Sequence, residues 1–128
     1  MLNKNFNLPE IEFIGGSTQI FSFTAYDEQR DLYQRLSECN VRFSVINYSN
    51  RNYGSPTIMI STYDTDNKVR IAQNDNGVYC NVEVELNPED TFDLSGKYIY
   101  QIEIINPEGF VEIPGQGILM IRRNTRSE

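Results

Sequence analysis

The chain has 128 residues, of which 39% are hydrophobic, and its eight tyrosines and seven phenylalanines give it enough apolar surface for a buried core. It contains no histidine, which excludes serine–histidine and cysteine–histidine catalysis and zinc sites with histidine ligands. The net charge of −7 argues against a protein that binds the phosphate backbone of nucleic acids. Basic residues cluster only near the end, at Arg122, Arg123 and Arg126. We therefore expect no nucleic-acid partner.

The balance of residue types predicts an all-β protein. The chain has only two alanines, but it has fourteen isoleucines, eight tyrosines, and seven each of valine, phenylalanine and threonine. These five types favour strands, whereas alanine is the best helix former. Fourteen asparagines add residues that suit turns.

The sequence shows no export signal and no membrane segment. Residues 1–7 have no long apolar run and no small-residue cleavage site, and no stretch reaches the roughly 20 apolar residues of a membrane-spanning helix. We expect synthesis in a cytoplasm, where disulfides are rare. Cys39 and Cys80 are therefore predicted to be free thiols.

In chain order, several segments alternate between apolar and polar residues, which is the pattern of a strand with one buried and one solvated face. The clearest are residues 19–25, 41–45, 78–86 and 98–104. Weaker strands are expected at residues 11–14, 57–61, 69–72, 110–113 and 118–122. Their apolar faces predict this core: Phe21, Phe23, Val41, Phe43, Val45, Cys80, Val82, Val84, Tyr100 and Ile102.

Turn-forming residues separate these strands. Residues 74–77 (Asn-Asp-Asn-Gly) predict a turn, and residues 106–109 (Asn-Pro-Glu-Gly) predict a short hairpin. Residues 115–117 (Gly-Gln-Gly) are expected to break the last hairpin. Strands about 8–15 residues apart indicate a β-sandwich of about seven to eight strands. Residues 28–38, where two leucines lie four positions apart, predict one short helical connection.

Residues 63–68 resemble the beginning of a calcium-binding loop. Counted from Asp64, the fifth, sixth and twelfth positions hold Lys68, Val69 and Asp75, where such a loop needs an oxygen ligand, a glycine and a glutamate. A hairpin turn between the flanking strands is the favoured interpretation, and we predict no metal site.

The carboxylates do not form a recognisable catalytic pair. Glu83, Glu85 and Glu103 alternate with apolar residues, so they are expected on the solvated faces of strands, whereas a catalytic pair needs one acid in an apolar pocket. We therefore predict a protein that is not an enzyme and needs no cofactor.

One segment has the composition of an adaptable binding loop. Residues 47–55 combine asparagine, serine and glycine with Tyr48, Arg51 and Tyr53, and Tyr63 is expected to extend the same surface. These four residues form the candidate binding surface. A solvated loop with incidental tyrosines explains the same composition equally well.

The order of features resembles a known family. A strand at residues 16–23 is followed by strands at 41–45 and 78–86, by residues 91–102, and by a hairpin leading to residues 117–121. Residues 94–100 (Leu-Ser-Gly-Lys-Tyr-Ile-Tyr) are the most telling stretch. Together these features resemble the N-terminal domain of phage baseplate upper proteins and related Ig-like domains of phage tail and fibre proteins. The resemblance covers residues 15–123 of a single expected domain, residues 1–128, with a short N-terminal arm and a C-terminal tail.

The resemblance implies an Ig-like antiparallel β-sandwich and a non-enzymatic structural role in a bacteriophage virion. A tail, baseplate or fibre-attachment component would contact other virion proteins or form a homo-oligomer. The resemblance leaves open whether a host-surface glycan is bound. The alternative is a bacterial carbohydrate- or protein-binding β-sandwich module that uses the Tyr48–Tyr53 loop. The absence of tryptophan, the side chain with the largest face for stacking on sugars, disfavours carbohydrate binding.

The terminal strands are the expected contact segments. An open sandwich has edge strands whose unpaired backbone groups accept another chain, and residues 11–14 and 118–122 are the candidate edges. In the second segment, apolar residues occupy both faces, namely Ile118, Leu119, Met120 and Ile121. We therefore expect association through the terminal segments.

Overall fold

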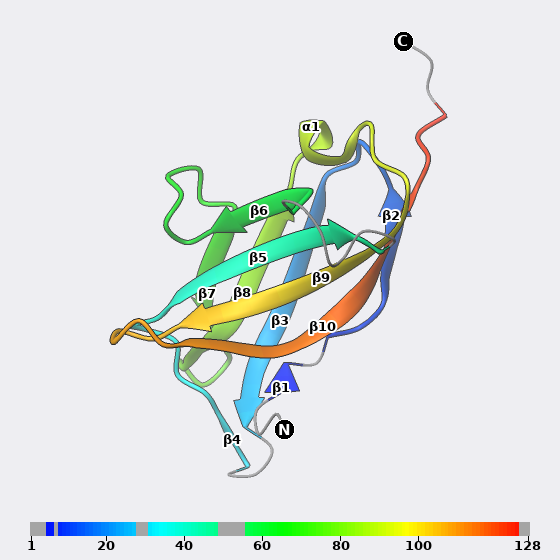
Figure 1. The fold of residues 1–128 in the computed structure, drawn as a ribbon. Coiled ribbons are helices and arrows are strands. Elements are labelled where there is room, and N and C mark those ends of the chain that lie inside the picture. Colours follow the sequence, from blue (N-terminus) through cyan, green and yellow to red (C-terminus); the bar gives the residue numbers. More distant parts are fainter. Residues whose placement is uncertain (1–4, 7, 28–30, 49–55, 126–128) are drawn as a thin grey trace.

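A computed structural model of the chain describes residues 5–6, 8–27, 31–48 and 56–125 (Figure 1). Two sheets pack face to face, which confirms the predicted all-β sandwich. The first sheet has the order β1 (Asn5–Phe6), β3 (Gln19–Asp27), β8 (Tyr79–Leu86), β7 (Val69–Gln73), and β4 (Leu32–Tyr33) pairs with the end of β3. The second has the order β2 (Ile11–Ile14), β10 (Val111–Arg122), β9 (Gly96–Ile105), β5 (Asn40–Asn47), β6 (Ile58–Ser61).

This strand order is that of an immunoglobulin-like sandwich. The path β1-β3-β8-β7 corresponds to the A-B-E-D sheet, and β10-β9-β5-β6 corresponds to the G-F-C-C′ sheet of the variable type. The pairing is antiparallel except between β2 and β10, which run parallel. The chain passes from the first sheet to the second between β1 and β2, where Pro9 lies.

Three aromatic side chains replace the disulfide and tryptophan of an immunoglobulin core. In such domains a tyrosine near the start of strand F lies two residues before a cysteine and bonds to the backbone upstream. Here the Tyr98 hydroxyl donates to the Ser95 carbonyl oxygen at 3.2 Å, and Tyr100 occupies the cysteine position. The Tyr100 ring centroid lies 5.7 Å from that of Phe23 on β3 and 5.8 Å from that of Phe43 on β5. Aromatic packing therefore joins the sheets.

The predicted core is confirmed at nine of its ten positions, all of which are buried. The exception is Phe21, which is only partly buried and packs at the margin of the core. Further buried residues come from strands that the sequence pattern predicted weakly or from the connection after β4: Phe13, Leu36, Leu119 and Ile121.

Two predicted turns are confirmed. Residues 74–78 join β7 to β8, and Gly77 has a φ of 81°, a conformation that favours glycine. Residues 106–110 join β9 to β10, where the Phe110 amide donates to Asn106 Oδ1 at 2.9 Å.

The expected break at residues 115–117 is wrong. Gly115 and Gly117 lie inside β10, which continues past an irregularity in its pairing with β9 between Glu112 and Gly115. Gly117 is required there because a Cβ atom at this position would lie 2.5 Å from Cζ of the buried Tyr100 ring. The glycine therefore serves the close approach of β10 to an aromatic ring and does not end a strand.

The predicted helix at residues 28–38 is also wrong within its described part, residues 31–38. These residues contain strand β4 and a turn, and the helix of the described chain is α1 (Pro88–Thr91), which lies far from β4 (Figure 1). Leu32 is exposed, whereas Leu36 is fully buried. The spacing of the two leucines therefore does not mark one apolar helix face.

The predicted edges are half correct. β2 is an edge strand of its sheet, but residues 118–122 are not an edge because β10 lies between β2 and β9. Leu119 and Ile121 face the core, and Ile118 and Met120 lie partly covered on the other face of the sheet. Apolar residues on both faces therefore do not mark this segment as an edge strand.

Burial of Tyr100 makes the stability of the sandwich sensitive to alkaline pH. Loss of solvation raises the pKa of its phenol to about 12, and the hydroxyl donates a hydrogen bond to the Pro9 carbonyl oxygen. Because the pKa of Tyr100 is higher in the folded state, its contribution to the free energy of unfolding is fully present below the pKa of tyrosine in the unfolded chain, pH ~10. That contribution is lost as the pH rises toward the pKa of Tyr100 in the folded state. We expect Tyr100 to account for about 1.4 kcal/mol of lost stability by pH ~11.

Urea unfolding at neutral and alkaline pH measures this loss, and Tyr100→Phe is the control because it removes the phenol but keeps the ring. The variant should lose less stability than the wild type over the alkaline range. Equal losses in the two proteins would show that Tyr100 does not cause the pH dependence.

Candidate binding surface

Tyr48 lies directly after β5 and is exposed, with its ring covered on one side by a lysine. The Nζ atom of Lys97 is 4.2 Å from the ring centroid, a cation–π contact between two neighbouring strands. Arg51 and Tyr53, the other predicted residues of this loop, lie outside the described residues. Binding by this loop therefore stays a prediction.

Tyr63 does not lie beside Tyr48. In the β5–β6 pair, Arg42 is opposite Ser61, and the Thr62 amide donates to the Val41 carbonyl oxygen at 2.9 Å. Tyr63 thus lies where β5 begins, whereas Tyr48 follows its other end. Seven residues of extended strand separate these positions by about 23 Å. The structure therefore does not combine the two tyrosines in one surface.

The segment with Tyr63 is not a hairpin turn, because β6 and β7 belong to different sheets. Its turn is held by Asp64, whose Oδ2 atom accepts a hydrogen bond from the Ser61 amide at 3.0 Å. Among the described residues, no three Asp, Glu or Cys side chains are placed to hold a metal ion.

A different set of segments meets at one end of the sandwich, which we call the loop end. It comprises residues 31–39, the β7–β8 turn together with Tyr79, and the β9–β10 hairpin as far as Ile113. The Leu36 amide donates to the Tyr79 carbonyl oxygen at 2.8 Å, and Gln34 Nε2 donates to Glu112 Oε1 at 3.2 Å. These bonds connect three segments that are far apart in the sequence.

Exposed apolar side chains are concentrated at the loop end. Six of the large hydrophobic residues that remain exposed in the described chain belong to these segments: Leu32, Tyr33, Tyr79, Phe110, Val111 and Ile113. Phe110, at the exit of the hairpin, is 71% exposed. Scattered apolar residues are normal on a protein surface, but an accumulation on adjoining segments is typical of interaction sites. No local pattern predicted this grouping, since it depends on which connections meet.

The loop end also contains a hollow of about 510 Å³, which is lined in part by Tyr26, Tyr33, Arg35 and Val78. The rings of Tyr26 and Tyr33 meet edge to face, with centroids 5.2 Å apart. The Tyr26 hydroxyl donates to Asp31 Oδ1. Rigid aromatic walls with polar groups at the margin are a common composition for protein recognition.

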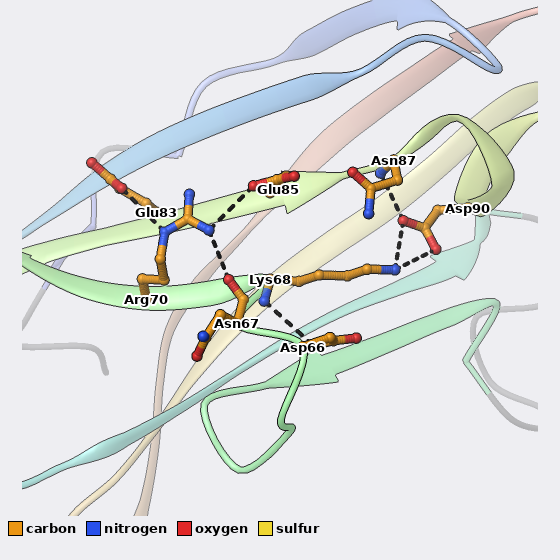
Figure 2. Close-up of polar contacts among 8 residues, drawn as sticks. All are labelled: Asp66, Asn67, Lys68, Arg70, Glu83, Glu85, Asn87 and Asp90. Atoms are coloured by element: carbon orange, nitrogen blue, oxygen red, sulfur yellow. Dashed lines mark hydrogen bonds and ion pairs between the residues drawn. The ribbon is translucent and has the colours of Figure 1, made fainter.

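Away from the loop end, a polar cluster connects the residue before β7 to the α1 segment (Figure 2). Lys68 Nζ lies 2.9 Å from both carboxylate oxygens of Asp90, and Asp90 Oδ2 also accepts from the Asn87 amide at 2.7 Å. The hydrogen bond to Asp90 raises the pKa of Lys68, so the amine stays protonated at neutral pH. A lysine nucleophile needs the opposite shift. This cluster is therefore an ion pair that positions α1.

Arg70 forms a second group of polar contacts next to the Lys68–Asp90 ion pair (Figure 2). Its guanidinium lies 3.5 Å from Glu83 Oε1 and 3.2 Å from Glu85 Oε1, and it donates to the Asn67 carbonyl oxygen at 2.7 Å. The two glutamates alternate along β8 on its solvated face, as the sequence pattern predicted. Their carboxylates are thus paired with a cation across the strands.

Both cysteines are free thiols, as predicted. Cys80 is fully buried, and desolvation raises the pKa of its thiol, which disfavours the reactive thiolate. Cys39 is partly buried at the margin of the core. The Cys80 thiol therefore acts as a small apolar side chain in the packing.

In the described part of the chain, no helix has the length and apolar character needed to cross a membrane. Comparison of the sequence with protein-family models and with curated proteins finds no match.

Proposed function

We propose that this chain is a non-enzymatic structural protein of a bacteriophage virion, a tail, baseplate or fibre-attachment component that binds other virion proteins or itself. The sequence resemblance to Ig-like phage tail and fibre domains is the source of the virion assignment. The strand order of the structure agrees with the Ig-like fold that this resemblance implies. A fold of this kind serves many functions, so the argument for binding depends on the surface.

The observation that carries the binding role is the concentration of exposed apolar side chains at the loop end. Phe110, Val111 and Ile113 lie on the hairpin, and Leu32 and Tyr33 lie on the neighbouring connection. A few side chains, many of them aromatic, contribute most of the binding free energy in protein interfaces. The shifts in the pKa of Lys68, Cys80 and Tyr100 all favour the protonated form, which is not the behaviour of an activated nucleophile.

Phage particles purified by density gradient test this proposal. Mass spectrometry should detect the chain in the particles at a fixed ratio to the tail proteins, and particles assembled with Phe110→Ser should contain much less of it. Ile20→Ser is the matched control, because Ile20 is also exposed but lies on β3, away from the hairpin. A chain that remains with the soluble fraction and is absent from particles would contradict the virion role. Equal incorporation of both variants would contradict binding through the loop end.

A further inference from the structure

The loop end carries exposed carboxylates that are not paired with a cation of the described chain. Its described segments contain five acidic side chains and one basic one: Asp31, Glu38, Asp75, Glu108, Glu112 and Arg35. Three of the five, Glu38, Asp75 and Glu108, are exposed and form no ion pair with any residue that the structure describes. Negative charge is therefore concentrated on the same segments as the exposed apolar side chains.

The glutamates of β2, β8 and β9 are, by contrast, all paired with arginines. The ion pairs join Glu12 to Arg122 at 3.1 Å, Glu103 to Arg42 at 2.8 Å, and Glu83 and Glu85 to Arg70 at 3.5 and 3.2 Å. A carboxylate that is paired within the chain has less attraction left for a charged partner than one without a cation. The unpaired carboxylates of the loop end are therefore available to attract a positively charged partner, unlike those of these strands.

Each segment of the loop end combines an exposed aromatic ring with one of these carboxylates. The combinations are Tyr33 with Glu38 on residues 31–39, Tyr79 with Asp75 at the β7–β8 turn, and Phe110 with Glu108 on the hairpin. The faces of aromatic rings attract cations and carboxylates pair with them, so both kinds of group favour lysine and arginine. The rings, together with the exposed Val111 and Ile113, also favour apolar contact. The loop end therefore suits a partner that presents basic side chains beside apolar ones.

The hollow of about 510 Å³ suits an apolar side chain of that partner. The rings of Tyr26 and Tyr33, which meet edge to face with centroids 5.2 Å apart, form part of its walls together with Val78. Arg35 also lines the hollow and would repel a cation there. The apolar contact therefore belongs in the hollow, and the basic side chains of the partner belong beside the exposed carboxylates outside it.

A second copy of the chain is a poor match for this surface. Two loop ends placed against each other would bring exposed carboxylates together, and like charges across an interface repel. The other surfaces of a second copy offer few cations, because four of its basic side chains are already in ion pairs: Arg42, Lys68, Arg70 and Arg122. Charge complementarity therefore selects a different protein as the partner.

We infer that the loop end binds a segment of a different protein in which lysine or arginine side chains lie beside aromatic or aliphatic ones. This inference rests on the proposed function, whose binding surface it uses, and it adds the chemistry of the partner. The contact involves the loop end in place of the terminal segments that the sequence predicted.

Fluorescence anisotropy with labelled peptides and the purified chain tests the chemistry of the partner. The probe is a short peptide in which lysine and phenylalanine alternate between glycines. In one comparison peptide glutamate replaces each lysine, and in another serine replaces each phenylalanine. Both comparison peptides should bind with a dissociation constant at least about tenfold higher, because each lacks one of the two complementary kinds of side chain. Equal binding of either comparison peptide would overturn the inference.

Two triple variants with the same net charge locate the site. The dissociation constant of the basic probe should rise about tenfold when three loop-end carboxylates are neutralised by Glu38→Gln, Asp75→Asn and Glu108→Gln. It should change less than about threefold in the control, which removes three acidic charges at the other ends of β7 and β8 by Asp66→Asn, Glu89→Gln and Asp93→Asn. Equal effects would indicate general attraction to an acidic protein and would contradict a site at the loop end. Melting temperatures establish that both variants are folded.

A single pair of variants tests the apolar contact with the same probe. Phe110→Ser should raise its dissociation constant about tenfold, whereas Ile20→Ser, at an exposed residue of β3, should leave it within about threefold. Added sodium chloride should weaken binding to the wild type, because it screens the carboxylates. Binding that neither salt nor Phe110→Ser weakens would overturn the inference.

Sedimentation velocity of the purified chain tests the other occupant. A monomer agrees with the inference, whereas an oligomer that Phe110→Ser dissociates would place a second copy on the loop end and overturn it. Absence of the chain from phage particles would contradict the virion role without changing the peptide result. Failure of the proposed function and failure of this inference are therefore separate results.

Discussion

Replacing Gly117 with alanine is expected to destabilise the sandwich by about 3 kcal/mol and to lower the melting temperature by about 10 °C. The added Cβ atom would lie 2.5 Å from Cζ and 2.6 Å from Cε2 of Tyr100. That ring is fully buried between Phe23 and Phe43, so it has no room to move away. Thermal and urea unfolding followed by circular dichroism measure the effect.

Gly115→Ala is the matched control on the same strand. A Cβ atom there would lie 3.4 Å from the end of the Leu8 side chain, and we expect a change within about 1 kcal/mol. A double-mutant cycle with Tyr100→Leu identifies the cause, because the smaller side chain should relieve most of the cost of Gly117→Ala. If the two substitutions are additive, contact with the ring is not the source of the destabilisation.

Replacing Phe43 with alanine is expected to cost about 3–5 kcal/mol. Phe43 is fully buried on β5. Its ring packs against Tyr100, which also contacts Phe23 of the other sheet. Removing it would leave a cavity that the neighbouring strands cannot close, because β5 is paired on both sides, with β6 and β9. The free energy of unfolding, measured by urea titration, gives the cost directly.

Phe110→Ala is the control for Phe43, since it removes the same ring from a site that is 71% exposed. It should change the free energy of unfolding by less than about 0.5 kcal/mol. A small cost at Phe43 would mean that the aromatic cluster does not hold the sheets together. A large cost at Phe110 would mean that this residue supports the fold, and its use as a test of binding would then be invalid.

The site could be predicted only in part. Tyr48 and Tyr63 are both exposed, as a binding-loop composition implied, but strand register separates them. Sequence composition describes a segment and contains no information on which segments meet in space. The loop end depends on hydrogen bonds such as that from Gln34 to Glu112, two residues 78 positions apart. No local pattern reports a contact of this kind.

The sequence by itself determined the features that depend on neighbouring residues. Alternation placed nine predicted side chains in the core, and the turns at residues 74–77 and 106–109 followed from residues that tolerate their backbone conformations. Only the tertiary structure decided the rest, because strand pairing joins residues distant in the chain. It made β10 an inner strand and turned the expected break at Gly117 into a site of close packing. Alternation along a strand defines its two faces, but strand pairing and sheet packing determine which residues each face contacts.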